Sequence, residues 1–73
     1  MSTLADKVIA LTKPYLGPAT DAFLTRQCGH LKIELGQLTQ AHLKDLAPWI
    51  QRSGALVMDA GKAAELAKKL VAL

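Results

Sequence analysis

The chain has 73 residues, a formal net charge of +3 and a single cysteine, and about half of its residues are hydrophobic. This length supports one domain at most, expected over residues 1–73, and no run of about 18 apolar residues is present that would form a membrane-spanning helix. The lone Cys28 excludes an intramolecular disulfide and MSTLADKV lacks a signal-peptide pattern, so we expect a soluble, cytoplasmic protein.

Leucine and alanine dominate the composition, whereas the aromatic residues are one Trp, one Tyr and one Phe. Leucine and alanine favour helices, and β-sheets favour the aromatic and β-branched residues that are few here. Helical periodicity divides the chain into segments separated by proline and glycine. We therefore predict an all-α fold, a compact bundle of four short helices with the third kinked near Pro48.

The first predicted helix starts at Ser2 or Thr3. Thr3 and Asp6 have approximately the spacing of a capping box. Pro14 lacks an amide hydrogen and disfavours helical angles at the residue before it, so this helix is expected to bend or end nearby. Its apolar stripe consists of Leu4, Val8, Leu11 and Tyr15.

The segment KPYLGP, residues 13–18, is predicted to be the corner between the first two helices. Gly17 suits a left-handed backbone just past a helix end, and Pro18 suits the first position of the next helix. The second helix is expected to run from Pro18 to about Cys28, with Gly29 as its stop. One of its sides is formed by Ala19, Ala22, Phe23, Arg26 and Gln27, and another by Leu24, Cys28 and Leu31. The Tyr15 hydroxyl is expected to find a polar partner near the surface.

The segment HLKIELG alternates like a strand, but the chain offers no second strand to pair with it. We expect an ordered connection that places Ile33 and Leu35 in the core. Thr39 is the predicted cap of the third helix, with Leu38 and Leu43 as a hydrophobic staple. The apolar face of this helix is predicted to comprise Leu43, Leu46, Ala47, Ile50 and Val57.

Pro48 either kinks the third helix or begins a new one, and Gly54 marks a further bend. Asp59 is the predicted cap of the last helix. In that helix Glu65 and Lys69 have the spacing of an ion pair, and basic residues complement the negative C-terminal pole. Its apolar stripe consists of Ala63, Leu66, Ala67, Leu70 and Val71.

Cys28, His30 and His42 are the only residues whose types and positions resemble a metal site. They form an incomplete set, because zinc sites usually need four ligands with paired spacings. Nucleophilic catalysis needs a base and an orienting group beside the nucleophile, and no such dyad stands out. We therefore predict no metal, no cofactor and no enzymatic activity.

Nucleic-acid binding is the alternative function, because the chain carries a surplus of Lys and Arg. The segment SGALVMDAGKAAELAKKL fits a helix-turn-helix only if its last helix reads bases, and that helix is poor in the residues that contact base edges. Single-strand binding also needs stacking aromatics, which are scarce. This alternative predicts phosphate-dominated, weakly specific binding.

Trp49 falls at the margin of the third helix's apolar face. It is either a residue packed in the core or an interface residue, and packing in the core is the favoured interpretation. The segment around it has more large apolar residues than one buried stripe requires. We predict an interaction patch that consists of Trp49, Leu56, Val57 and Met58.

Three sets of residues carry a resemblance to a known kind of module: Tyr15–Ala19, then Phe23-Leu24 with Gln27-Cys28, then Leu43–Ala47. They resemble short helical modules of uncharacterised function in bacterial proteins, with a Y-[LI]-G-P-[AI] corner and an L-x-x-L-A segment. Such modules are often appended to signalling or regulatory proteins, so the resemblance implies a docking or regulatory role in a bacterial protein. The predicted function is a non-catalytic interaction module whose partner is another protein or domain, or a second copy.

Overall fold

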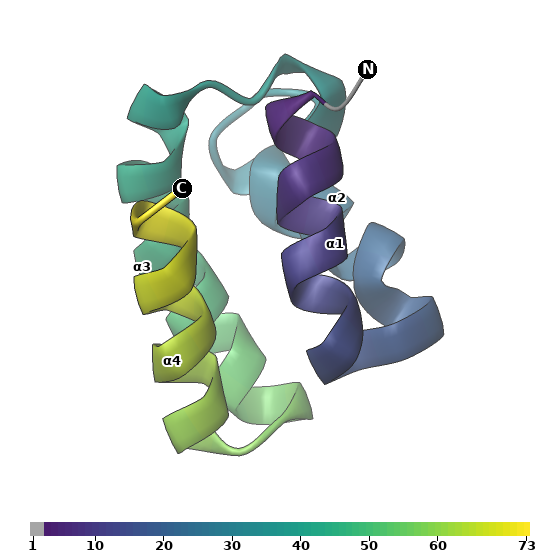
Figure 1. Ribbon diagram of the computed structural model, residues 1–73, viewed down its shortest axis with the longest axis vertical. Helices are drawn as coiled ribbons and strands as arrows, with labels where there is room; N and C mark the ends of the chain where they lie inside the picture. The colour runs from purple at the N-terminus through teal and green to yellow at the C-terminus, as the bar shows by residue number, and fades with distance from the viewer. Residues whose placement is uncertain (1–2) are drawn as a thin grey trace.

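The computed structural model describes residues 3–73, in which every regular element is helical (Figure 1). The elements are α1 (Leu4–Leu16), the 3-10 helix η1 (Gly17–Ala19), α2 (Thr20–His30), the 3-10 helix η2 (Leu35–Gln37), α3 (Gln40–Val57) and α4 (Ala60–Val71). The radius of gyration is 10.8 Å. The predicted all-α class and compact shape are therefore confirmed.

The predicted division into four short helices needs correction. Over residues 3–73 the chain forms three uninterrupted helical runs, 4–30, 40–57 and 60–71, besides the short η2. The first two predicted helices merge into one run because η1 joins α1 to α2 without a non-helical residue. The chain still changes direction there, so α1 and α2 lie against each other (Figure 1).

The start of α1 matches the predicted capping box. The Asp6 amide donates to Thr3 Oγ1 and the Thr3 amide donates to Asp6 Oδ2, both at 3.1 Å. Ser2, the alternative start, lies outside the described residues. Pro14 is accommodated inside the last turn, and α1 ends two residues later at Leu16. The helix thus ends near Pro14, as expected.

Gly17 turns the chain with a backbone that glycine adopts readily. Its φ of 56° and ψ of −127° lie in a region that side chains with a Cβ rarely occupy. Its amide donates to the carbonyl of Lys13, which closes α1, and Pro18 then sits in the first turn of η1. The predicted corner is confirmed at Gly17, whereas α2 begins at Thr20 and not at Pro18 as predicted.

The end of α2 differs from the expectation, because the helix passes through Gly29 and ends at His30. The left-handed residue is Lys32, with φ of 59°. The amide of Ile33 donates to the carbonyl of Cys28 at 3.2 Å and that of Lys32 to Gly29 at 3.1 Å, the pattern of a Schellman motif. Lysine therefore occupies a position for which sequence rules expect glycine.

α3 runs without a break from Gln40 to Val57, so Pro48 does not begin a new helix and Gly54 does not end one. The predicted kink at Pro48 is not confirmed and stays a prediction. Thr39 caps α3 and Asp59 precedes α4, both at the predicted positions, although the Asp59 side chain makes no capping hydrogen bond.

The core lies between α1 and α2 on one side and the hairpin of α3 and α4 on the other (Figure 1). Its buried residues are Val8, Leu24, Cys28, Leu38, Leu43, Leu46, Ile50, Leu66 and Leu70. Ile33 and Leu35 are partly buried against this core, which confirms the ordered connection predicted between α2 and α3. Most of the predicted apolar stripes are thus correct.

α3 and α4 make the most extensive contact between elements. Gly54 is buried where they approach, and a Cβ added there would lie 3.0 Å from the Cβ of Ala63 and 3.5 Å from Met58 Cε. A contact of 3.0 Å between carbon atoms is well inside ordinary van der Waals distance. Gly54 therefore permits close helix packing rather than the bend that the sequence suggested.

Replacing Gly54 by Val should lower the free energy of unfolding by about 1–3 kcal/mol, because the added carbons overpack the contact with α4. Urea denaturation measures this loss. Combining it with Ala63→Gly should cost less than the sum of the two single losses, since the second change restores space. Strict additivity would contradict the proposed steric contact.

Replacing Gly17 by Ala should lower the free energy of unfolding by about 1–2 kcal/mol, because alanine is strained at a positive φ. Gly29→Ala is the matched control: this helical glycine has open space around its missing Cβ, and alanine there should stabilise by up to about 1 kcal/mol. Thermal or urea denaturation of both variants checks the opposite signs. Equal changes in the free energy of unfolding for the two variants would contradict the backbone strain expected at residue 17.

Candidate functional site

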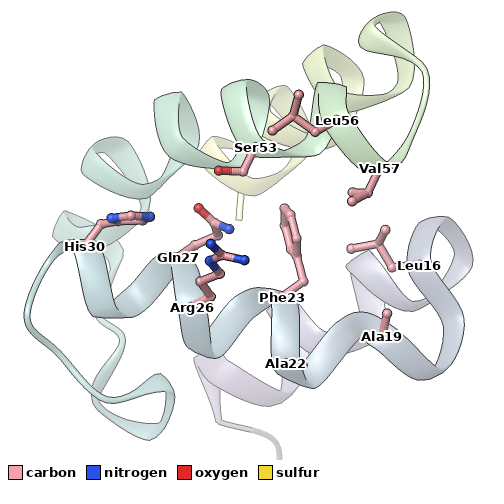
Figure 2. Close-up of a pocket in the computed structure, with 10 residues that line it drawn as sticks. All are labelled: Leu16, Ala19, Ala22, Phe23, Arg26, Gln27, His30, Ser53, Leu56 and Val57. Carbon is pink, nitrogen blue, oxygen red and sulfur yellow. The ribbon is translucent and has the colours of Figure 1, made fainter.

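A groove of about 400 Å³ lies between α2 and the C-terminal part of α3 (Figure 2). It is open to solvent along its length and its lining is largely apolar. The lining residues are Leu16, Ala19, Ala22, Phe23, Arg26, Gln27, His30, Ser53, Leu56 and Val57. Its size falls within the range of small ligand or peptide sites.

One wall of the groove is the side of the second predicted helix that comprises Ala19, Ala22, Phe23, Arg26 and Gln27. All five residues of that side line the groove, Ala19 from η1 and the other four from α2, whereas Leu24 and Cys28 from the other side are fully buried. Residues at spacings of three and four lie on one face of a helix, which explains this division. Phe23 is the largest apolar group of this wall, and Figure 2 shows its ring rising toward α3.

The α3 wall exposes two large apolar side chains. Leu56 is 86% exposed and Val57 is 59% exposed, although both line the groove. The prediction that Val57 continues the buried face of α3 is therefore wrong: it is the last residue of the helix and sits at the groove's edge. With Leu16 and Phe23, these residues make one end of the groove apolar (Figure 2).

The other end of the groove is polar. Arg26, His30 and Ser53 line it, and the His30 ring stacks on Trp49 with centroids 4.1 Å apart and planes 8° apart. Arg52 extends this cluster, with its Cζ 5.8 Å from the Trp49 ring centroid. Such flat stacking and cation–π geometry hold aromatic groups in place at a surface.

Gln27 lies at the boundary between the two ends. Its side chain is 1% exposed, and its Oε1 is buried without a hydrogen-bond partner among residues 3–73. Thr20 Oγ1 shares this condition but does not line the groove. Buried polar atoms nearly always have partners, so an unpaired carbonyl at the groove wall requires an explanation.

The predicted patch of Trp49, Leu56, Val57 and Met58 is only partly brought together. Leu56 and Val57 both line the groove. Trp49 is partly buried and does not line the groove, but its ring stacks on His30, which does. Met58 instead packs against the core. The favoured interpretation of Trp49 as a core anchor is not supported, because it lies outside the core cluster.

Cys28, His30 and His42 occupy three different environments. Cys28 is buried in the core, where burial raises the pKa of its thiol and favours the neutral form. His30 stacks on Trp49, and His42 Nδ1 accepts a hydrogen bond from the Thr39 amide at 3.1 Å. Within residues 3–73, no three or more His, Cys, Asp and Glu side chains converge as metal ligands.

A polar cluster on the opposite side of the bundle ties α1 to α4. Tyr15 Oη donates to Glu65 Oε1 at 3.0 Å and accepts from Lys69 Nζ at 3.0 Å, and Lys69 lies 2.9 Å from Glu65. These contacts confirm the predicted pair in α4 and the predicted polar partner for Tyr15. The pKa of Glu65 is lowered mainly by the hydrogen bond from Lys69, and to a smaller extent by the one from Tyr15. The pKa of Lys69 is raised mainly by its hydrogen bond to Tyr15, and to a smaller extent by the one to Glu65.

No protein-family model matches this chain, and no similar curated protein or solved structure was found. The resemblance to bacterial helical modules therefore stays a prediction. Within the part of the chain that the structure describes, no helix is both long and apolar enough to cross a bilayer. The basic residues are distributed over α1, α2, α3, α4 and the connection after α2, so nucleic-acid binding also stays a prediction.

The Glu65 cluster predicts an acid-dependent contribution to stability. Because the folded pKa of Glu65 lies below its ordinary value of 4.5, the contribution is present above that value and is lost as pH falls through the folded pKa. Tyr15→Phe and Glu65→Gln should both reduce the stability lost between neutral and acidic pH. Urea denaturation of each protein across this pH range measures the difference. If the loss of stability between neutral and acidic pH were the same in both variants as in the unchanged protein, the cluster would not contribute to stability.

Proposed function

We propose that the chain is a non-catalytic protein-interaction module that receives an apolar segment of another protein, or of a second copy, in the groove between α2 and α3. The observation that carries this proposal is the exposure of Leu56 and Val57 beside Phe23. Grooves between helices are a common site for helical segments of partner proteins.

The energetic basis is the apolar surface that the fold leaves uncovered. Burying a leucine or valine side chain contributes about 1.5–3 kcal/mol, and Leu56 retains most of that contribution for a partner. Trp49 and Arg52 at the polar margin are residue types enriched in interface hot spots. The apolar end supplies affinity and the polar end supplies orientation.

The proposal includes a regulatory role in a bacterial cytoplasm, which rests on the resemblance described above and on the single buried thiol. It also retains the bend of α3 at Pro48, since proline removes one hydrogen bond from the middle of that helix. Such a bend would direct the C-terminal part of α3, which carries Ser53 and Leu56, relative to the first part.

A selection for binding peptides tests the proposal directly. A displayed library of helical peptides with randomised surface residues is passed over the immobilised protein, and recovered peptides are measured on wild type and on Leu56→Asp. We expect peptides whose affinity falls at least about tenfold in this variant, because the charge opposes apolar burial in the groove. Equilibrium sedimentation of both proteins measures self-association through the same groove.

Leu56 is an informative position because it contributes little to the folded core. Its substitution should change the free energy of unfolding by less than about 0.5 kcal/mol, so lost binding is not lost folding. Lys62→Asp, an exposed substitution in α4 that does not line the groove, is the control and should leave the selected peptides bound. Failure to recover any peptide sensitive to Leu56→Asp, together with a monomer at all concentrations, would refute the proposal.

A further inference from the structure

The lining of the groove carries positive charge at its polar end and no carboxylate. Arg26 lines the groove, whereas Arg52 lies just outside it, beside Trp49 in a neighbouring hollow that Asp45 also lines. Neither arginine forms an ion pair with any residue in 3–73. None of the ten residues that line the groove is acidic. Because docking removes water from these side chains, a negatively charged partner group is favoured at this end.

Gln27 adds a second and independent requirement. Its buried Oε1 has no partner, and Figure 2 shows its amide directed from α2 toward α3. A carbonyl oxygen accepts hydrogen bonds, so an occupant with an N–H or O–H donor at this position would complete the bonding of Gln27. A fatty acid would pair with the arginines, but its carboxylate accepts hydrogen bonds and offers Gln27 no donor.

The first turn of an α-helix meets both requirements together. Its first four N–H groups have no partner within the helix, so they are available to Gln27. Acidic side chains are also favoured in this turn, because they interact well with the positive pole of the helix. An N-terminal helical turn thus brings donors and negative charge to the same place.

The distances between groove residues along α2 predict where the apolar residues of the partner helix lie in its sequence. Phe23 lies three residues from Arg26 and seven from His30, or about 4.5 and 10.5 Å along the helix axis. A partner helix has the same rise, so its apolar residues should follow the acidic turn by three to four and by seven positions. They would then reach the end lined by Phe23, Leu56 and Val57.

We propose that the groove takes an amphipathic helix of a partner protein that docks with its acidic N-terminal turn at Arg26, Gln27 and Arg52 and its apolar residues at Phe23, Leu56 and Val57. This inference rests on the proposed function and adds to it the chemistry and the orientation of the partner. A second copy of the chain, or a partner recognised by apolar burial alone, is an outcome that the test separates.

Two synthetic peptides of identical composition test the orientation. Both are acetylated, amidated and about 16 residues long, which gives four helical turns. One carries two Glu in its first turn and Leu in its second and third turns, and the other carries the same residues in reverse order. Trp49 is the only tryptophan of the chain and lies at the groove's polar end, so its fluorescence reports binding by these Trp-free peptides.

We expect the acidic-first peptide to bind at least about tenfold more tightly than the reversed peptide and to shift the amide resonances of Arg26, Gln27 and Ser53. Equal binding of both peptides in the groove would overturn the inference while leaving the proposed function intact. Absence of groove shifts with the acidic-first peptide would also overturn it, and the peptide selection described above then decides the proposed function separately.

Charge variants test the electrostatic part. Arg26→Gln combined with Arg52→Gln should weaken the acidic-first peptide at least about fivefold and reduce the salt dependence of its affinity. Lys62→Gln combined with Lys68→Gln removes the same number of positive charges from α4, away from the groove, and should leave affinity within about twofold. Equal losses in both proteins would show that only net charge matters and would overturn the inference.

Gln27→Met separates a binding role from a structural one, because Met removes the unpaired carbonyl and keeps a side chain of similar length. The melting temperature should rise by about 4–8 °C, since an unsatisfied buried acceptor is removed. Affinity for the acidic-first peptide should fall about threefold or more, since its donor loses an acceptor. A raised melting temperature with unchanged affinity would overturn the role assigned to Gln27.

Discussion

The close approach of α3 to α4 at Gly54 and Ala63 is the contact on which the rest of the fold depends. It lets α4 cover one side of α3, so that Leu66 and Leu70 are fully buried with Leu46 and Ile50. The opposite side of the last two turns of α3 faces α2, with Leu16 of α1 and Ala19 of η1 at one end. The groove follows from this one-sided packing, because α2 approaches that side without filling the space beside Leu56 and Val57.

The features that the sequence predicts well are those determined within one or two helical turns. The capping boxes at Thr3 and Thr39 depend on residues three positions apart, and the corner at Gly17 depends on a backbone preference of glycine itself. The apolar stripes depend only on helical spacing, which also separated the groove side of α2 from its core side. For these reasons the all-α class and half of the candidate site are readable without a structure.

The features that the sequence predicts poorly involve contacts between distant residues or competition among neighbours. His30 and Trp49 are nineteen positions apart, and nothing in either local pattern indicates that their rings stack. Met58 follows Val57 directly, yet Met58 folds onto the core and Val57 points into the groove, because the end of a helix frees consecutive residues from a common face. α2 continues past Gly29, the predicted stop, and the left-handed residue that follows the helix is Lys32, where hydrogen bonds to the carbonyls of Cys28 and Gly29 close the last turn.

The division of the chain into an early helical run and a late hairpin has a consequence for folding. Only Met58 and Asp59 connect α3 to α4, so forming this hairpin costs little loop-closure entropy. Joining Tyr15 to Lys69 instead closes a loop of more than fifty residues. One wall of the groove belongs to each half, and the groove exists only after the two halves have docked. A ligand held there is therefore linked to the global unfolding equilibrium, and its binding slows hydrogen exchange in both halves alike.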